Sequence, residues 1–320
     1  MREIVRGYIT YFMEESFEDN EFNQITLAAE ALTRTLAESA ELRNVLSDLN
    51  VGKMLRKSIV KDLISKKFSA DSAAILSFMA AAEPSAQLGS AINQMVTEID
   101  SIRSLYSHHK ASQNGADPLP LSSDTFASVY LTAFQKYSSY GQVHDLAAGY
   151  LEPIFEKTED ISQLKVMEDN LYAVNRLLEE NRDLVKALGD PYGNAQAKLA
   201  IVSSLFASRV DQLTYRILRF IASIPRVRDV SGLVGFCVEL ITRERGRRLA
   251  EVRAVVPLSS EETARLRTLL ERLVDRKVEM RFVTDQTIMA GFVVLIGDYV
   301  LDASLLTKFN KLSESLALSA

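Results

Sequence analysis

The sequence predicts an α+β protein that is predominantly α-helical, with two tandem helical bundles followed by a small mixed α/β domain. Two observations support this prediction. Apolar residues recur at helical spacing through most of the chain, and only after residue 249 do they change to the two-residue period of β-strands. In addition, the first 105 residues match a later stretch when the chain is shifted by 142 positions. We therefore expect domains at residues 1–105, 106–144, 145–248 and 249–320.

The composition is that of an ordinary globular protein. Of the 320 residues, 47% are hydrophobic and 25% are charged, and the length suffices for two or three domains. A net charge of -5 argues against non-specific nucleic-acid binding, because such binding needs a strongly basic surface. No run of about 18 apolar residues occurs, so we expect no direct membrane span. The early acidic side chains argue against a signal peptide.

The first copy, residues 1–105, is expected to consist of helices only. Apolar residues at intervals of three and four mark successive amphipathic segments. Glu83-Pro84 interrupts this pattern before the last segment, because proline cannot continue a helix. The expected helical segments are Ile4–Phe12, Ile25–Leu36, Val51–Ile64, Asp71–Met79 and Gln87–Leu105.

The second copy, residues 145–248, follows from an ungapped match at an offset of 142. Gly7-Tyr8 aligns with Gly149-Tyr150, and Phe78 aligns with Phe220. Helical periodicity alone does not hold one register over so long a stretch, so we interpret the match as a duplicated helical domain. Two copies, unlike the many short units of a solenoid, must each close their own core. Further aligned pairs are Glu14 with Glu156, Glu38 with Glu180, Leu42 with Leu184 and Asp48 with Asp190.

Residues 106–144 are predicted to form a linker with one extra helix. The polar stretch Ser107–Pro120 contains Gly115 and two prolines, which is typical of a linker. Residues 123–140 carry a broad aromatic face at helical spacing and have no counterpart in the repeat. This helix either packs on one bundle or acts as a strut between the two. His108-His109 lacks nearby cysteine or acidic partners, so we expect it to be solvated rather than to bind a metal.

Two features of the second copy allow a functional or a structural interpretation, and we favour the structural one for both. Cys237 stands among apolar residues without a histidine motif, which predicts a buried helical thiol rather than a nucleophile. The arginine-rich segment Ile241–Arg248 is expected to complement the dipole of the helix that it ends, rather than to bind nucleic acid. Gly246 is then expected just past the end of this helix.

The last domain, residues 249–320, predicts strand, helix, strand, hairpin and helix in that order. Leu249–Val256 alternates apolar and polar residues and ends at Pro257, and Ser259 and Glu262 have the spacing of a capping box that begins a helix. This helix allows the next strand to pair parallel with the first. The remaining elements are a strand through Val278, Met280 and Phe282, a hairpin of Gly291–Ile296 and Tyr299–Leu301 around Gly297-Asp298, and a last helix, capped by Asp302, with Leu305, Leu306, Phe309, Leu312 and Leu316.

Three short segments of this domain carry a resemblance to a known family. They are Ala254-Val-Val-Pro-Leu258 before a helix, Met289-Ala-Gly291, and Ile296-Gly-Asp-Tyr-Val-Leu-Asp302 followed by Ser304. In these residues and in the order of elements, the chain resembles the delta subunit of rotary F-type ATP synthases, called oligomycin-sensitivity-conferring protein in mitochondria. It departs from the family at Ala303, where glycine is usual, and in having two bundles where ordinary members have one.

The resemblance implies a structural stator component that works in ATP synthesis and proton transport without catalysing a reaction itself. Its implied partners are the amino-terminal helices of the alpha subunits in the catalytic head and the b-type subunit of the peripheral stalk. The implied location is peripheral, on the cytoplasmic face of the energy-transducing membrane.

The candidate partner-binding residues lie mostly in the second copy, where apolar side chains exceed what a small core needs. The resemblance places the alpha-subunit helix between the first and fifth helices of a bundle, and Arg226 matches an arginine-containing break of the family. We expect the second bundle to bind the head, and the first to brace the stalk or to offer a second docking site. An ordinary place in the core is the alternative for each apolar residue. The candidates are Tyr150, Ile154, Ile217, Phe220, Ile221, Ile224 and Arg226, with Tyr8 and Phe12 in the first copy.

No catalytic or cofactor-binding pattern accompanies these features. The sequence contains no phosphate loop, no Gly-x-Gly-x-x-Gly after a strand, no His-Glu-x-x-His and no spaced set of cysteines. The acid pairs Glu14-Glu15 and Glu261-Glu262 are expected at helix starts or on exposed faces, where a solvated role is favoured over acid–base catalysis. We expect no enzymatic activity, no cofactor and no metal. The alternative function is a helical regulatory adaptor or scaffold that binds a peptide or a small ligand.

Overall fold

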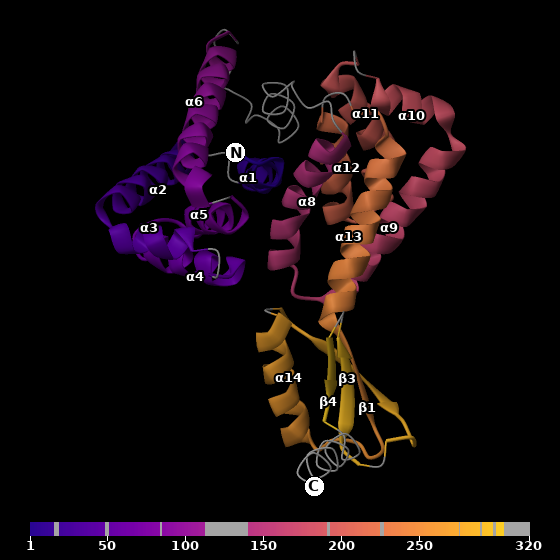
Figure 1. Cartoon of the computed structure of the whole chain (residues 1–320). Helices are drawn as coiled ribbons and strands as arrows, with labels where there is room; N and C mark the ends of the chain where they lie inside the picture. Colours follow the sequence, from indigo (N-terminus) through magenta and orange to yellow (C-terminus); the bar gives the residue numbers. More distant parts are fainter. Residues whose placement is uncertain are drawn as a thin grey trace. The chain divides into compact units, whose positions relative to one another are not determined.

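The computed structural model confirms the predicted fold class, a predominantly helical chain with one small mixed sheet (Figure 1). It describes residues 1–15, 19–48, 51–83, 85–112, 140–190, 193–224, 227–274, 276–288, 290–296 and 299–303. The extra helix expected before Tyr140, the turn Gly297-Asp298 and the last helix at 305–316 lie outside these residues. The chain divides into two compact units, one with Met1–Ile154 and Val174–Cys237 and the other with Phe155–Ala173 and Val238–Ala320.

The first copy is built around one buried helix. Helix α5 is buried from Ile75 to Ala80, and α1, α2 and α4 all pack against it. The chain breaks between α5 and α6 at the predicted place. The elements are α1 (Glu3–Glu15), α2 (Asp19–Glu38), α3 (Ala40–Ser47), α4 (Lys53–Ile64), α5 (Ala70–Ala82), the short 3-10 helix η1 (Ser85–Gln87) and α6 (Leu88–Ser112).

Three helices of the second copy begin and end where the sequence offset places them. Adding 142 to the bounds of α2, α3 and α4 gives the bounds of α9, α10 and α11 to the residue. The second-copy helices are α8 (Tyr140–Lys157), α9 (Ile161–Glu180), α10 (Arg182–Gly189), α11 (Ala195–Phe206), α12 (Gln212–Ser223) and α13 (Val230–Arg248). The domain boundaries at residues 105, 144 and 248 stay a prediction.

Side-chain caps explain why α5 and α12 begin at equivalent residues. Ser69 accepts a hydrogen bond from the Ser72 amide at 3.3 Å at the start of α5. At the matching position in the second copy, Asp211 accepts from the Leu213 and Thr214 amides at 2.9 and 3.1 Å. Both residue types satisfy amides that have no partner inside the helix.

The small domain has the predicted strand, helix, strand and hairpin. Its elements are β1 (Leu249–Ala254), α14 (Ser260–Val274), β2 (Glu279–Thr284), β3 (Phe292–Ile296) and β4 (Tyr299–Asp302). The sheet order is β2-β1-β3-β4, with β1 and β2 parallel and the β1–β3 and β3–β4 pairs antiparallel. The predicted capping box is confirmed, since the Ser259 amide donates to Glu262 at 2.9 Å and the Glu262 amide donates to Ser259 Oγ at 3.3 Å.

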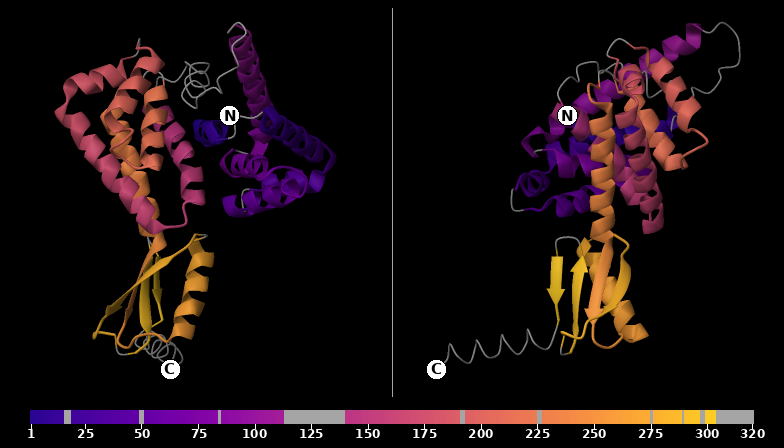
Figure 2. Two further views of the ribbon diagram at one scale, coloured as in Figure 1. Left: turned by 180° about the vertical axis from the view of Figure 1, so that it is seen from behind. Right: turned by 90° about the vertical axis from the view of Figure 1, so that its right-hand side faces the viewer.

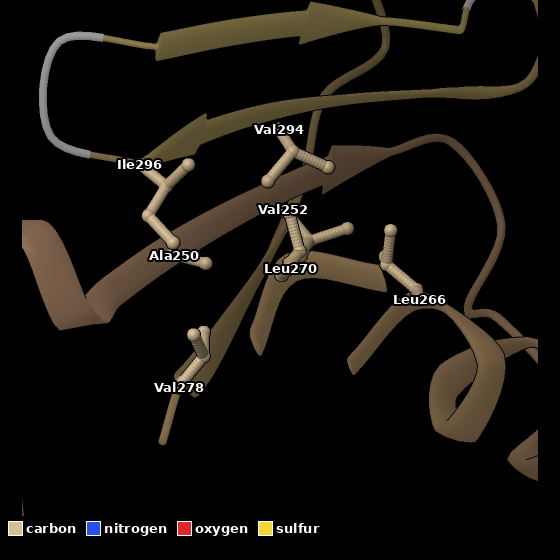
Figure 3. Close-up of a cluster of buried hydrophobic side chains, with 7 residues drawn as sticks. All are labelled: Ala250, Val252, Leu266, Leu270, Val278, Val294 and Ile296. Atoms are coloured by element: carbon tan, nitrogen blue, oxygen red, sulfur yellow. The ribbon is translucent and has the colours of Figure 1, made fainter. Parts of the chain in front are cut away.

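Helix α14 covers one face of this sheet, as both figures show (Figures 1 and 2). Alternate residues of β1 point toward the helix, so Ala250 and Val252 are buried while their strand neighbours are only partly covered. Leu266 and Leu270 of α14 meet them from the other side (Figure 3). The full buried cluster is Ala250, Val252, Leu266, Leu270, Val278, Val294 and Ile296.

The prediction for Gly246 is wrong, because α13 continues through Gly246 to Arg248 and passes directly into β1 at Leu249. Arg248 does not remain at the surface near the end of its own helix. It is 1% exposed, and its guanidinium donates to the carbonyl oxygens of Phe155 and Thr158 at the end of α8. It also pairs with Glu244 at 3.0 Å, and Glu244 accepts from Arg276 of the small domain at 3.3 Å. No turn is needed at residue 246, because a buried arginine fixes the junction.

Candidate functional site

The structure brings the candidate residues together on α1, α8 and α12, and buries them. Tyr8 and Phe12 lie on α1, Tyr150 and Ile154 on α8, and the remaining apolar candidates on α12 or, for Ile224, at its C-cap. All eight are at most 3% exposed. Arg226 lies outside the described residues. As a docking surface, this face therefore has to be uncovered first.

Within each copy, the first helix packs on the fifth through a stacked aromatic pair. The rings of Tyr8 and Phe78 lie 4.0 Å apart at an interplanar angle of 4°. Those of Tyr150 and Phe220, the matching residues, lie 3.8 Å apart at 9°. Stacking of this kind adds specificity to apolar burial. These pairs place Tyr8 and Tyr150 in equivalent environments of the two copies.

Helices α1 and α8 cross at two glycines, Gly7 and Gly149, which are equivalent in the repeat. A Cβ atom on Gly7 would collide with the Leu146 carbonyl oxygen and lie 2.8 Å from the Tyr150 nitrogen. A Cβ atom on Gly149 would collide with the Ile4 carbonyl oxygen, and Ile4 is the repeat equivalent of Leu146. The crossing is therefore nearly symmetric, and only glycine permits backbones to approach so closely.

A cluster of polar side chains fastens the end of α1 to α8 and α12. The Tyr150 hydroxyl donates to the Glu14 carboxylate. Arg216 Nε donates to Glu14 Oε2 at 3.3 Å and to the Tyr150 hydroxyl at 3.1 Å. Arg216 Nη2 donates to the Tyr11 carbonyl oxygen at 2.8 Å, and its guanidinium lies 3.9 Å from the centre of the Tyr11 ring. Arg216 thus contacts α1 in three ways: through the Glu14 carboxylate, the Tyr11 carbonyl oxygen and the face of the Tyr11 ring.

Burial dominates the electrostatics of this cluster. Burial raises the pKa of Glu14, and the hydrogen bond from Tyr150 and the charge of Arg216 oppose that rise only in part. Burial and the neighbouring Glu14 charge also raise the pKa of Tyr150, so that its hydroxyl stays protonated and can donate. The ionised Glu14 carboxylate therefore carries a desolvation cost that Tyr150 and Arg216 offset only in part.

The expectation that Glu14 lies at a helix start or on an exposed face is wrong. Glu14 lies in the last turn of α1, and its side chain is only 7% exposed. Sequence reasoning missed it together with Tyr11 and Arg216. One signal was present in the repeat: Arg216 stands where the first copy has Ala74, so a charge appears on one copy of an otherwise matched helix.

A separate apolar hollow of about 330 Å³, which includes open solvent, lies within the second-copy helices. Of the candidate residues, Ile221 lines it. Its walls carry no charged side chain and suit only apolar groups. It is lined by Val174, Leu178, Leu188, Val202, Phe206, Leu218, Ile221, Ala222, Val230 and Val234.

In the part of the chain that the structure describes, Cys237 is not placed to act as a nucleophile, and the metal-ligating side chains do not cluster. Cys237 is buried as predicted, and burial raises the pKa of its thiol to about 12, far from a reactive thiolate. Within the described residues, no group of three or more histidine, cysteine or acidic side chains could hold a metal ion. No described helix is long and apolar enough to cross a membrane.

Comparison with known proteins relates the second copy and the small domain to one family. Residues 146–316, more than half of the chain, match the family model described as ATP synthase delta (OSCP) subunit. Proteins named ATP synthase subunit delta match at 33% identity in Frankia casuarinae, 29% in Lachnoclostridium phytofermentans and 30% in Brevibacillus brevis. These matches cover 50%, 52% and 52% of this chain, and 58%, 92% and 94% of the respective relatives. The family match begins at residue 146, so the first copy lies outside it.

Proposed function

The chain belongs to the ATP synthase delta (OSCP) subunit family, and from this premise we propose that it is a structural stator component that links the catalytic head of a rotary F-type ATP synthase to its peripheral stalk. Membership gives the chain a role in ATP synthase as a structural, non-catalytic and peripheral subunit. The finer assignment concerns its partners: the amino-terminal helices of alpha subunits at one end and a b-type subunit at the other. We place it on the cytoplasmic face of the energy-transducing membrane.

The observation that carries the proposal is the arrangement of the second copy, in which the family match begins. There α8 and α12 carry a set of large apolar side chains, which are buried in the structure, next to Arg216 of α12. A helix laid on such a face contributes roughly 25 cal/mol per Å² of buried apolar area, and the arginine adds orientation. We assign head binding to this face, and to the first bundle the bracing of the stalk or a second docking role.

The small domain offers a surface suited to the stalk. Leu266 and Leu270 of α14 face the sheet, whereas Leu269 and Leu273 of the same helix are 56% and 43% exposed. Exposed leucines on adjacent helical turns form an apolar stripe of the kind that packs against another helix. This stripe supports the assignment of the b-type subunit to the small domain.

The junction before the small domain also suits a stator, which must resist torque. No residue separates α13 from β1, and Arg248 is bonded at this point to Glu244 and to the carbonyl oxygens of Phe155, in the last turn of α8, and Thr158, just after it. A flexible linker would let the small domain rotate freely and would transmit no torque. A helix that continues directly into a strand and is fixed by buried hydrogen bonds resists such rotation.

Co-purification tests the proposal. A tagged full-length chain, isolated from its own cells after a low-salt membrane wash, should carry ATP synthase alpha and b subunits identifiable by mass spectrometry. Leu269→Ser should reduce recovery of the b-type subunit, while Thr268→Ser, at an exposed neighbouring position, should not. Isolation of the chain without any ATP synthase subunit would reject the stator and favour an adaptor role.

A further inference from the structure

Helix α1 already occupies the face that we propose for the partner helix. The α8/α12 face, defined by Leu146, Gly149 and Tyr150 of α8 and Arg216 of α12, is contacted by Ile4, Gly7, Tyr11 and Glu14 of α1. We infer that α1 is an internal occupant of this face, and that a partner helix with the same pattern displaces it. This inference rests on the proposed function, because it describes how the same docking face is regulated.

The contacts of α1 define the chemistry that the partner helix needs. Gly7, Tyr11 and Glu14 are spaced by four and three residues, so they lie on one side of α1. Gly7 allows the close crossing with α8, Tyr11 packs on the Arg216 guanidinium, and Glu14 accepts from Arg216 and Tyr150. The partner is therefore an amphipathic helix with a small residue at the crossing, an apolar or aromatic residue four positions later and an acidic residue three positions beyond that.

Two features make α1 displaceable. Glu14 and Arg216 form an ion pair across the contact with side chains only 7% and 19% exposed, and the gain from such a pair is largely offset by the loss of hydration. The raised pKa of Glu14 agrees with this balance. The tether is what favours α1, because a segment of the same chain acts at a high effective concentration. An external helix can displace α1 when it makes the same polar contacts and buries more apolar area.

The two glycines allow a test that separates the occupant from its receptor. In Gly7→Ala, the new methyl group sits on α1 and collides with α8, so the occupant leaves while the face on α8 stays unchanged. In Gly149→Ala, the methyl group sits on α8, so the occupant leaves and the face itself is blocked. Gly89→Ala and Gly246→Ala are matched controls, because a Cβ atom at either position meets nothing within 4 Å. All four variants replace a helical glycine with alanine, so a gain in helix propensity is common to variants and controls.

The probe is a fluorescent peptide with the sequence of residues 2–15, titrated against the full-length proteins by fluorescence anisotropy. We expect Gly7→Ala to bind the peptide at least tenfold more tightly than the unchanged protein. Gly149→Ala and the two control variants should show no gain. A peptide carrying Glu14→Gln should lose most of the gain, because it lacks the carboxylate that pairs with Arg216 in the α1 contact.

Hydrogen exchange measured by mass spectrometry reports whether α1 has left. In Gly7→Ala, amides of α8 near Gly149 should exchange at least tenfold faster, and adding the peptide should restore their protection. Equal peptide binding by Gly7→Ala and Gly149→Ala would overturn the inference, as would unchanged exchange in Gly7→Ala. Self-association of Gly7→Ala in place of peptide binding would make a second copy of the chain the occupant, and would also overturn it.

The outcome is independent of the test of the stator role. If the chain co-purifies with ATP synthase subunits but its Gly7→Ala variant gains no peptide binding, the proposed function stands and the internal occupant is rejected. If the variant gains peptide binding but the chain carries no ATP synthase subunit, the displaceable helix stands and the stator role is rejected.

Discussion

Replacing Arg248 with methionine should loosen the junction between α8, α13 and the small domain. The guanidinium donates to Glu244 at 3.0 Å, to the Thr158 carbonyl oxygen at 2.6 Å and to the Phe155 carbonyl oxygen. The two carbonyl groups lie at the end of α8, where the helix itself supplies no donor. Methionine fills part of the volume but donates nothing, so both carbonyl groups lose this donor.

The magnitude follows from these contacts. Hydrogen bonds from a charged donor are worth roughly 1.5–3 kcal/mol each when buried. Glu244 keeps Arg276 as a partner at 3.3 Å, so its charge is not left alone. Two lost bonds to carbonyl groups correspond to roughly 3–6 kcal/mol. We expect the lower part of this range, roughly 3–4 kcal/mol of local destabilisation, because methionine fills part of the volume and no buried charge is left alone. Arg248→Lys should fall between, because lysine keeps the charge but cannot reach both carbonyl groups as a fork.

Native-state hydrogen exchange is the appropriate assay, because a chain of two compact units need not unfold in one step. Amides of β1 should exchange roughly 100- to 1,000-fold faster in Arg248→Met, which is the predicted free energy at about 1.4 kcal/mol per factor of ten. Arg243→Met is the matched control: it removes an arginine of the same helix that pairs with Glu239, also four residues earlier, but whose side chain is 57% exposed. It should cost less than about 1 kcal/mol. Equal effects of the two substitutions would refute the role of burial at Arg248.

Three further predictions concern the polar cluster, the thiol and the small core. Because the folded-state pKa of Glu14 is raised, its contribution to stability is complete below its ordinary value of 4.5 and is lost as pH rises through the raised value. The melting temperature of the unchanged protein, relative to Glu14→Gln, should therefore fall as pH increases from 4.5 through the raised pKa; a difference independent of pH would contradict this. Cys237 should react with a thiol reagent at pH 8 only after denaturation, given its burial and a pKa of about 12, and rapid labelling of the native protein would contradict that burial. Leu270→Ala should cost roughly 2–5 kcal/mol in chemical unfolding of the small domain, whereas its exposed neighbour Leu269→Ala should cost less than about 0.5 kcal/mol; similar losses at both positions would contradict the packing of α14.

Much of the fold could be predicted from the sequence because its signals are local. The spacing of Ser259 and Glu262 specified a helix start, alternation in Leu249–Val256 specified a strand, and the apolar surroundings of Cys237 specified burial. The end of α13 was misjudged for the same reason. Glycine is common just past the end of a helix. Nothing near Gly246 reveals that Arg248 is bonded to the carbonyl groups of Phe155 and Thr158, which lie 93 and 90 residues away in the sequence.

The candidate site was predictable only in part, because its apolar residues carry a periodic signal and its polar contacts do not. Tyr150 and Phe220 follow from helical spacing and from the repeat. The pairing of Glu14 with Arg216 joins residues 202 positions apart, and no local pattern indicates it. Gly7 and Gly149 were visible as a matched pair, but sequence alone does not say that each faces the backbone of the other helix.

The glycine crossing also places a constraint on how such chains can diverge. Every single-nucleotide change of a glycine codon that alters the amino acid adds at least a Cβ atom, so no first mutational step at Gly7 or Gly149 preserves the contact. Selection on the two glycine codons is therefore coupled, although 142 positions separate them. Proteins with both bundles should retain glycine at both positions where they keep this crossing, and should lose it at both where they do not. Glycine at this pair of positions thus becomes a genetic marker for the paired architecture, readable without a structure.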